Sequence, residues 1–111
     1  MNAHDGPQKT PDGHHVVIKG RNWRATDPSL PEDVAARLRR HLMAARRAVR
    51  SATTADDAAA ERQARARVQQ AKIALGERGT PWWEQSPDQR RRRWEDHLAK
   101  LDADAPDRRD S

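Results

Sequence analysis

The sequence predicts a mainly α-helical domain, in which an N-terminal β-hairpin leads into an antiparallel helical hairpin and a third helix anchored by tryptophan. Two consecutive segments carry apolar residues at helical spacing, and the short link between them makes them antiparallel neighbours. A third segment opens with a helix-capping motif. β-Favouring residues gather near the N-terminus on both sides of a glycine, as in a hairpin.

Composition limits the size of the core. The chain has 111 residues, of which 34% are hydrophobic and 35% are charged. Alanine accounts for 19 of the hydrophobic residues, Phe and Tyr are absent, and four tryptophans supply most of the aromatic mass. We therefore expect one small domain with a thin core, whose stability is low or is completed by a partner.

The β-hairpin is predicted over residues 14–26, with its turn at Gly20-Arg21. Two strands alone are marginal in water, so the hairpin must pack against the helices. The face that does so carries either Trp23 and Val17 or Val16 and Ile18.

Two segments at the ends of the chain are predicted to be disordered tails. Residues 1–13 and 102–111 are rich in polar residues and show no apolar periodicity. The single domain is accordingly assigned to residues 14–101.

Helix one is predicted over residues 31–51. Ser29 and Glu32 have the spacing of a capping box, and Pro31 is tolerated in a first helical turn. The apolar stripe of this helix recurs every three or four residues and consists of Val34, Leu38, Leu42, Ala45 and Val49.

Helix two is predicted over residues 55–75, after a short link that ends in a threonine cap. Its main stripe consists of Ala60, Ala64, Val68, Ala71 and Leu75. A weaker line of Ala59, Ala66 and Ile73 occupies another face, which could receive either the tryptophan segment or a second copy of the chain.

Helix three is predicted over residues 87–101. Ser86 and Gln89 form a capping box, and Pro87 takes the first helical position that proline prefers. Trp94, Leu98 and Leu101 share one face, which is expected to pack on the helical hairpin.

Several kinds of chemistry find no support in the sequence. Cysteine is absent, and none of the five histidines pairs with another at the i, i+4 spacing of a helical metal site. The serines lie in no Gly-x-Ser-x-Gly elbow, and no Gly-rich phosphate loop occurs. We expect no metal, no cofactor and no catalysis.

The same reading predicts a soluble protein of the cytoplasm. No run of about 18 apolar residues could cross a bilayer, so no membrane partner is expected. The N-terminal segment lacks the apolar core of a secretory signal.

Arginine clusters are candidates for polyanion binding. The net charge is +5, and Arg39, Arg46 and Arg50 gather on one side of helix one. A second cluster consists of Arg90, Arg91, Arg92 and Arg93. Four consecutive helical positions point in all directions, so this run cannot form one flat patch. Each cluster is interpreted either as a solvated face with local ion pairs or as a contact with phosphates.

Trp82 and Trp83 are the candidate partner-binding residues. One interpretation is that the indoles lock the segment across the helical hairpin and add core volume. The other is that one of them is an exposed anchor for a partner protein or a stacking platform for a base.

Three motifs together resemble a family of small basic proteins, of uncharacterised function, from bacteria with GC-rich genomes. The resemblance covers residues 16–84, and its motifs read GRNWRATDPSLP, LMAARRAV and AKIALGERGTPWWE, the last being the most specific. Some members of that family carry a name that refers to Tol biopolymer transport. The resemblance implies no activity, ligand or functional residue for this chain.

The function that the sequence favours is that of a non-enzymatic interaction protein. It would bind a protein partner, or a second copy of itself, through the helical face or the Trp82-Trp83 segment. The alternative is a nucleic-acid-associated protein that uses the arginine face of helix one together with Arg90–Arg93.

Overall fold

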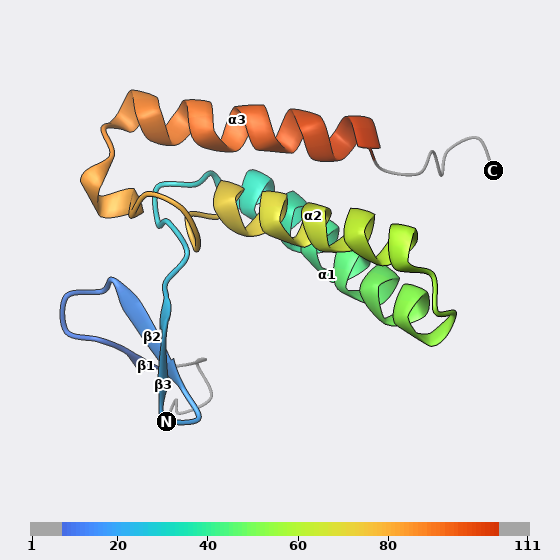
Figure 1. Cartoon of the computed structure of the whole chain (residues 1–111). Helices are drawn as coiled ribbons and strands as arrows, with labels where there is room; N and C mark the ends of the chain where they lie inside the picture. Colours follow the sequence, from blue (N-terminus) through green and yellow to red (C-terminus); the bar gives the residue numbers. More distant parts are fainter. Residues whose placement is uncertain (1–7, 105–111) are drawn as a thin grey trace.

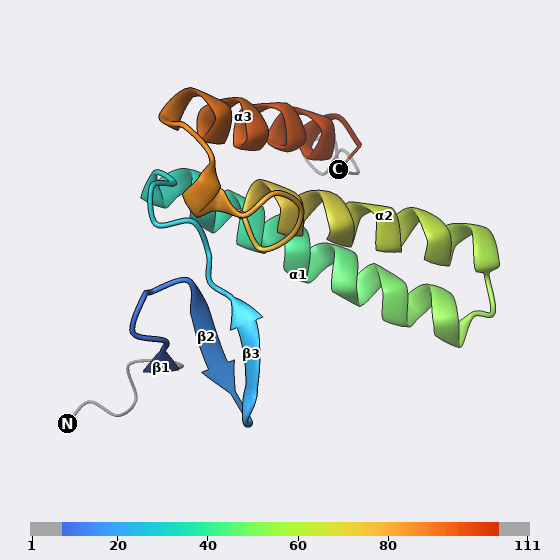
Figure 2. The ribbon, with the colours of Figure 1, turned by 60° about the vertical axis from the view of Figure 1, so that its left-hand side comes forward.

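The structure is a computed structural model that describes residues 8–104. Helix α1 (Glu32–Thr54) and helix α2 (Ala58–Ala74) lie side by side and antiparallel, and α3 (Pro87–Asp104) lies over them on the side opposite to a small sheet (Figures 1 and 2). A 3-10 turn, η1 (Trp82–Glu84), precedes α3. The predicted fold class, mainly helical with a small antiparallel N-terminal sheet, is confirmed.

The sheet has three strands rather than the two of the predicted hairpin. Strands β2 (His15–Ile18) and β3 (Arg21–Arg24) form the hairpin, and β1 (Gln8–Lys9) adds to the other edge of β2. The turn is Lys19-Gly20, one residue earlier than predicted. Both residues have positive φ, 52° and 78°, as a type I′ turn requires.

Strand β1 corrects the prediction that residues 1–13 form a disordered tail. The segment that follows β1 is fixed by its own side chains, since Asp12 accepts hydrogen bonds from the Thr10 hydroxyl at 2.7 Å and from the backbone of His14 at 3.0 Å. A two-residue strand is too short to show periodicity, which explains why the sequence did not reveal it. The predicted disorder of residues 1–7 lies outside the described residues.

The two long helices differ from their predicted bounds at the caps. Pro31 is the N-cap of α1 without a side-chain hydrogen bond, because Ser29 donates to Asp27 instead of completing the predicted capping box. Helix α1 continues through Thr54, and Asp57 caps α2 by accepting from the Ala60 backbone at 3.0 Å. The predicted threonine cap is therefore wrong, since an aspartate three residues later performs this role.

The core forms where α1, α2 and α3 meet. Leu38 is fully buried, and the buried alanines of α2 allow the helices to approach closely. The cluster contains Leu30, Val34, Ala35, Leu38, Leu42, Ala71, Ala74, Leu75, Leu98 and Leu101, with Val68 and Trp94 packed against it. The apolar stripes predicted for helices one and two thus contact each other.

Helix α3 begins as predicted. The backbone of Ser86 donates to the Gln89 side chain at 2.8 Å, and the Gln89 backbone donates to the Ser86 hydroxyl at 3.2 Å. The helix runs three residues beyond its predicted end, because Asp102 bonds to both Arg37 and His41 of α1. Residues 102–104 are therefore not a tail, and residues 105–111 lie outside the described range.

None of the helices within residues 8–104 combines the length and the apolar character that a bilayer crossing requires.

Candidate functional site

A buried ion pair joins the sheet to the helices. Asp27, which follows β3, is 2% exposed, and Arg93 of α3 is 9% exposed. Arg93 donates to Asp27 Oδ2 at 2.7 Å, to the Gln85 side chain at 2.6 Å and to the Ala74 carbonyl at 3.3 Å. Every one of these bonds is internal to the fold, so the pair is a structural junction.

The electrostatics of this junction favour an ionised Asp27. Burial alone would raise the pKa of the carboxyl, but hydrogen bonds from Arg93 and from Ser29 outweigh it and lower the pKa below 3.8. Ser29 contributes both its hydroxyl, at 2.7 Å, and its backbone N–H, at 2.8 Å. Sequence reasoning missed this pair because nothing local marks Asp27 as the partner of an arginine 66 residues away.

Trp82 belongs to the same junction. Its indole N–H donates to the Ala25 carbonyl at 2.9 Å, and its side chain is 7% exposed. The Arg90 guanidinium lies 5.3 Å from the ring centroid. Trp82 is a packing residue, and the interpretation of this indole as an exposed anchor is corrected.

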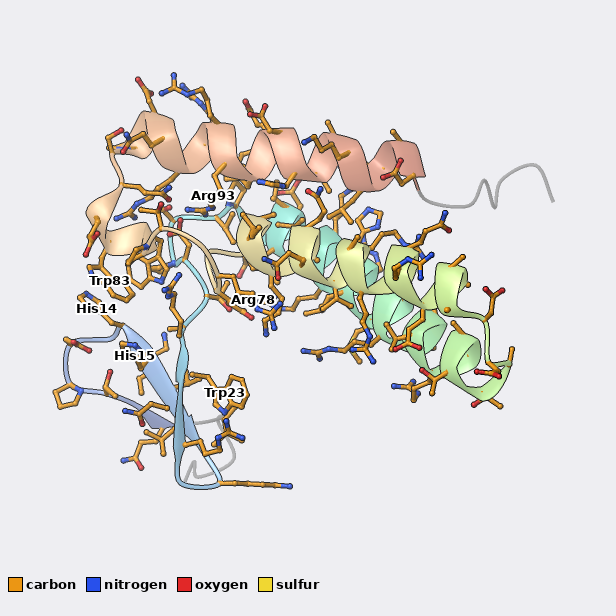
Figure 3. All side chains as sticks on the ribbon, viewed as in Figure 1. His14, His15, Trp23, Arg78, Trp83 and Arg93 are labelled. Atoms are coloured by element: carbon orange, nitrogen blue, oxygen red, sulfur yellow. The ribbon has the colours of Figure 1, made fainter. Side chains whose placement is uncertain are left out.

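Trp83 is held against the sheet. Its ring stacks on His14 with centroids 3.8 Å apart and planes 4° from parallel, and Figure 3 shows the two side chains together where the loop meets the sheet. The Arg24 guanidinium lies 5.8 Å from the ring. The two indoles therefore connect the sheet to the segment before α3, and Trp83 remains half-buried.

The arginine run of α3 is divided among different environments. Arg93 is buried and Arg90 is half-buried, with its Nη1 3.5 Å from Asp27. Arg91 pairs with Asp88 at 3.3 Å, and Arg92 is exposed. Arg90 and Arg91 line one shallow hollow at the start of α3, whereas Arg93 is directed into the fold, so the four side chains do not form a single surface.

A groove separates the sheet from the helical pair. It has a volume of about 640 Å³, and we call it the sheet–helix groove. Its apolar lining comes from Val16, Ile18, Trp23, Leu42, Met43 and Leu75. Its polar lining comes from Arg24, Arg39, Arg46, Lys72, Glu77 and Arg78.

Strand pairing explains the apolar wall. Val16 pairs directly with Trp23, so both side chains project from the same face of the sheet, and Ile18 follows on that face. This face looks toward α1 but does not close on it. Trp23, Ile18 and Met43 remain 43%, 41% and 51% exposed. Figure 3 shows Trp23 projecting from β3, with Arg78 between it and the helices.

The rim of the groove is cationic. Glu77 is the one carboxylate among the lining residues. It forms an ion pair with Lys72 at 3.3 Å and accepts a hydrogen bond from the Thr26 hydroxyl at 2.7 Å. Arg39 and Arg46, two of the predicted polyanion-binding residues, lie here. The sequence predicted these arginines but not the exposure of Met43. Of the two faces predicted to pack on the helices, the pairing of Trp23 with Val17 is wrong, because the register places Trp23 on the face of Val16 and Ile18.

The described residues assemble no recognisable metal-ligand set. Among residues 8–104, no three His, Cys, Asp or Glu side chains are gathered as ligands of one ion. No protein-family model, curated protein or solved structure matches this chain.

Proposed function

We propose that this protein is a non-enzymatic interaction module that binds a partner protein in the sheet–helix groove. The observation that carries the proposal is the exposure of three large apolar side chains, Ile18, Trp23 and Met43, around one hollow. A chain with so few bulky apolar residues gains stability by burying them, so leaving three of them open to solvent is costly.

The residue types in the groove are those that protein interfaces prefer. Trp, Met and Arg are enriched at interface centres, and Trp23, Met43, Arg39 and Arg46 occur together here. Methionine also adapts its shape to different partners. A groove between a sheet face and a helix offers an extended segment two walls at once.

In this proposal Trp82 and Trp83 act as the scaffold. They fix the sheet relative to the helices through Ala25 and His14, and so hold the groove open. We also place the protein in the cytoplasm, in keeping with a chain that contains no cysteine.

The test is a selection from an unbiased library of displayed linear peptides. We expect peptides that bind the wild-type protein and lose at least about ten-fold in affinity on Met43→Asp, because a charge then enters the apolar floor. Ala44→Asp is the matched control, since Ala44 is exposed on the same helix and does not line the groove. Failure to enrich any peptide, or equal loss with both variants, would refute the groove as a protein-binding site.

Nucleic-acid binding is the second candidate function. It is favoured by Trp23, whose exposed ring lies among arginines and could stack on a base. The surface proposed for nucleic acid is the arginine face of α1 and does not use Arg90–Arg93 as one patch, because Arg93 is buried against Asp27. Salt-dependent retention on a single-stranded DNA column, abolished by Trp23→Ala, would support it over the peptide-binding proposal.

Self-association is a third outcome that the same groove permits. A second copy could instead pack on the helical face predicted from sequence, where Ala59 and Ala66 are exposed and small enough for close approach; this face does not line the groove. Sedimentation equilibrium of the wild type and of Met43→Asp would show whether a second copy occupies the groove. A dimer that persists in Met43→Asp would indicate that face.

A further inference from the structure

We infer that the partner segment has two parts, an apolar anchor and, next to it in the chain, a cluster of carboxylates. This inference rests on the proposed function and adds the chemistry of the partner. It arises from a second hollow that continues the sheet–helix groove between α1 and α2. That hollow also measures about 640 Å³, and we call it the cationic hollow.

The two hollows are parts of one surface. They share Trp23, Arg46, Lys72 and Arg78, so a ligand can pass from one to the other without leaving the protein. Trp23 lies where the two hollows meet. Its ring is fixed on one side by the Arg21 guanidinium, 4.9 Å from the centroid.

The cationic hollow differs from its neighbour in charge. Its lining holds five cationic side chains and no carboxylate: Arg46, Arg50, Arg65, Lys72 and Arg78. Two of these cations have acidic neighbours, since Arg65 pairs with Glu61 at 2.8 Å and Lys72 with Glu77 at 3.3 Å. Within residues 8–104, no carboxylate lies within ion-pair distance of Arg46, Arg50 or Arg78.

Several arginine side chains around one hollow favour an anionic ligand. Like charges that line one hollow repel one another, and an incoming carboxylate reduces the repulsion while accepting two parallel N–H bonds from one arginine. Arg78 donates to the neutral Gln69 side chain, a bond that leaves its charge without a counter-ion. Arg50 is the third polyanion-binding residue predicted from sequence, and it lies here rather than in the first groove.

Carboxylates fit this surface better than a nucleic-acid backbone. The residues that α1 and α2 contribute come from the middle of each helix or, like Lys72, from its C-terminal turn. The hollow therefore lacks the backbone N–H groups of a helix N-terminus, which many phosphate sites use. Trp23 is the one aromatic side chain that lines either hollow, and Ile18, Met43 and Val16 offer aliphatic contact rather than stacking. A peptide with a Leu or Phe anchor would fit the apolar lining of the sheet–helix groove, and its acidic residues would fit the cationic hollow.

The experiment uses the full-length protein and fluorescence polarisation at low ionic strength. The probes are two fluorescein-labelled peptides in which about four residues rich in Leu and Phe either precede or follow about four Glu, so that each is slightly longer than a typical strand. The test variant is Arg50→Glu with Arg65→Glu. The control variant is Arg47→Glu with Arg62→Glu, which lies on the same helices, lines neither hollow and changes the formal charge equally.

We expect the test variant to weaken binding by about ten-fold or more and the control by less than about three-fold, since only the first removes direct contacts. We also expect a probe with Gln in place of Glu to bind about ten-fold more weakly. Circular dichroism of both double variants is the control for correct folding.

Three results would overturn the inference. If the Gln probe binds as tightly as the Glu probe while Met43→Asp still abolishes binding, the groove binds peptides but the acidic partner is wrong. If both double variants weaken binding equally, the attraction is non-specific. If no peptide binds and a single-stranded oligonucleotide of equal charge does, the protein-binding proposal fails together with this inference.

Discussion

Replacing Arg93 with methionine tests the buried ion pair directly. Arg93→Met keeps most of the apolar stem and removes the charge, which leaves Asp27 buried with no exposure of its side chain to water. Removing one partner of a buried pair costs about 3–5 kcal/mol, because the other charge loses its main counter-ion. Ser29 still donates to Asp27 and Arg90 Nη1 still lies 3.5 Å from it, so we expect the lower end of that range, about 3 kcal/mol. A domain of this size has a total stability of about 5–15 kcal/mol, so the loss amounts to about a fifth of it or more.

The expected shift is measurable by thermal unfolding. At about 4–8 °C per kcal/mol for a domain of roughly 100 residues, Arg93→Met lowers Tm by at least about 12 °C. Arg92→Met, one residue earlier and exposed, is the control and changes stability by no more than about 0.5 kcal/mol. Circular dichroism melts at neutral pH compare the two.

A double-mutant cycle separates the ion pair from simple packing loss. In an Asp27→Asn background the buried charge without a counter-ion is the Arg93 guanidinium itself, and Arg93→Met removes it. Arg93→Met should therefore cost less there by about 1–3 kcal/mol. Equal melting temperatures for Arg93→Met and Arg92→Met would show that the junction is not buried in solution. Equal costs of Arg93→Met in both backgrounds would show that charge plays no part.

Three further perturbations test the core, the loop and the pH response. Leu38→Asp places an unpaired charge at a fully buried site and should abolish the cooperative melt, and an unchanged melt would contradict the packing of α1. Gly76→Ala should lower the free energy of unfolding, measured in urea, by about 1–3 kcal/mol. Gly76 has a φ of +84°, and an alanine Cβ there would lie 2.9 Å from the Cβ of Asp27. A variant as stable as the wild type would argue against this close approach. Burial, and next the nearby Lys100 charge, lower the pKa of His97 in the folded protein below 6.5. As the pH falls below about 6.5, this histidine therefore takes up a proton in the unfolded chain before it does so in the folded protein, and the free energy of unfolding decreases. His97→Gln should remove this part of the acid loss in melts between about pH 7 and pH 5, and an unchanged pH slope would contradict it.

The helices were predictable because their signals are local. The stripes that include Leu38 and Val68 follow helical periodicity, and the Ser86–Gln89 box needs only residues three positions apart. The Ser29 cap failed for a related reason. The Ser29 hydroxyl could either cap the N-terminus of α1 or donate a hydrogen bond to Asp27. It donates to Asp27, because that carboxylate is buried and cannot be solvated by water.

The candidate site was predictable only in part. Periodicity placed Arg39, Arg46 and Arg50 on one face, and the structure puts all three on the two adjoining hollows. No sequence pattern could show that Arg93 is buried while Arg92 is exposed, because that depends on where the chain returns to Asp27. The exposure of Met43 likewise depends on the tilt of a sheet formed far from it in sequence.

The junction also changes how binding experiments on the tryptophans must be interpreted. Trp82, Trp83 and Arg93 line neither hollow, yet they fix the sheet whose Val16, Ile18 and Trp23 form one wall of the groove. Loss of a partner on Trp82→Ala would therefore be expected even though Trp82 never touches that partner. Only substitutions that leave the junction intact, such as Met43→Asp, report on contact with the partner itself.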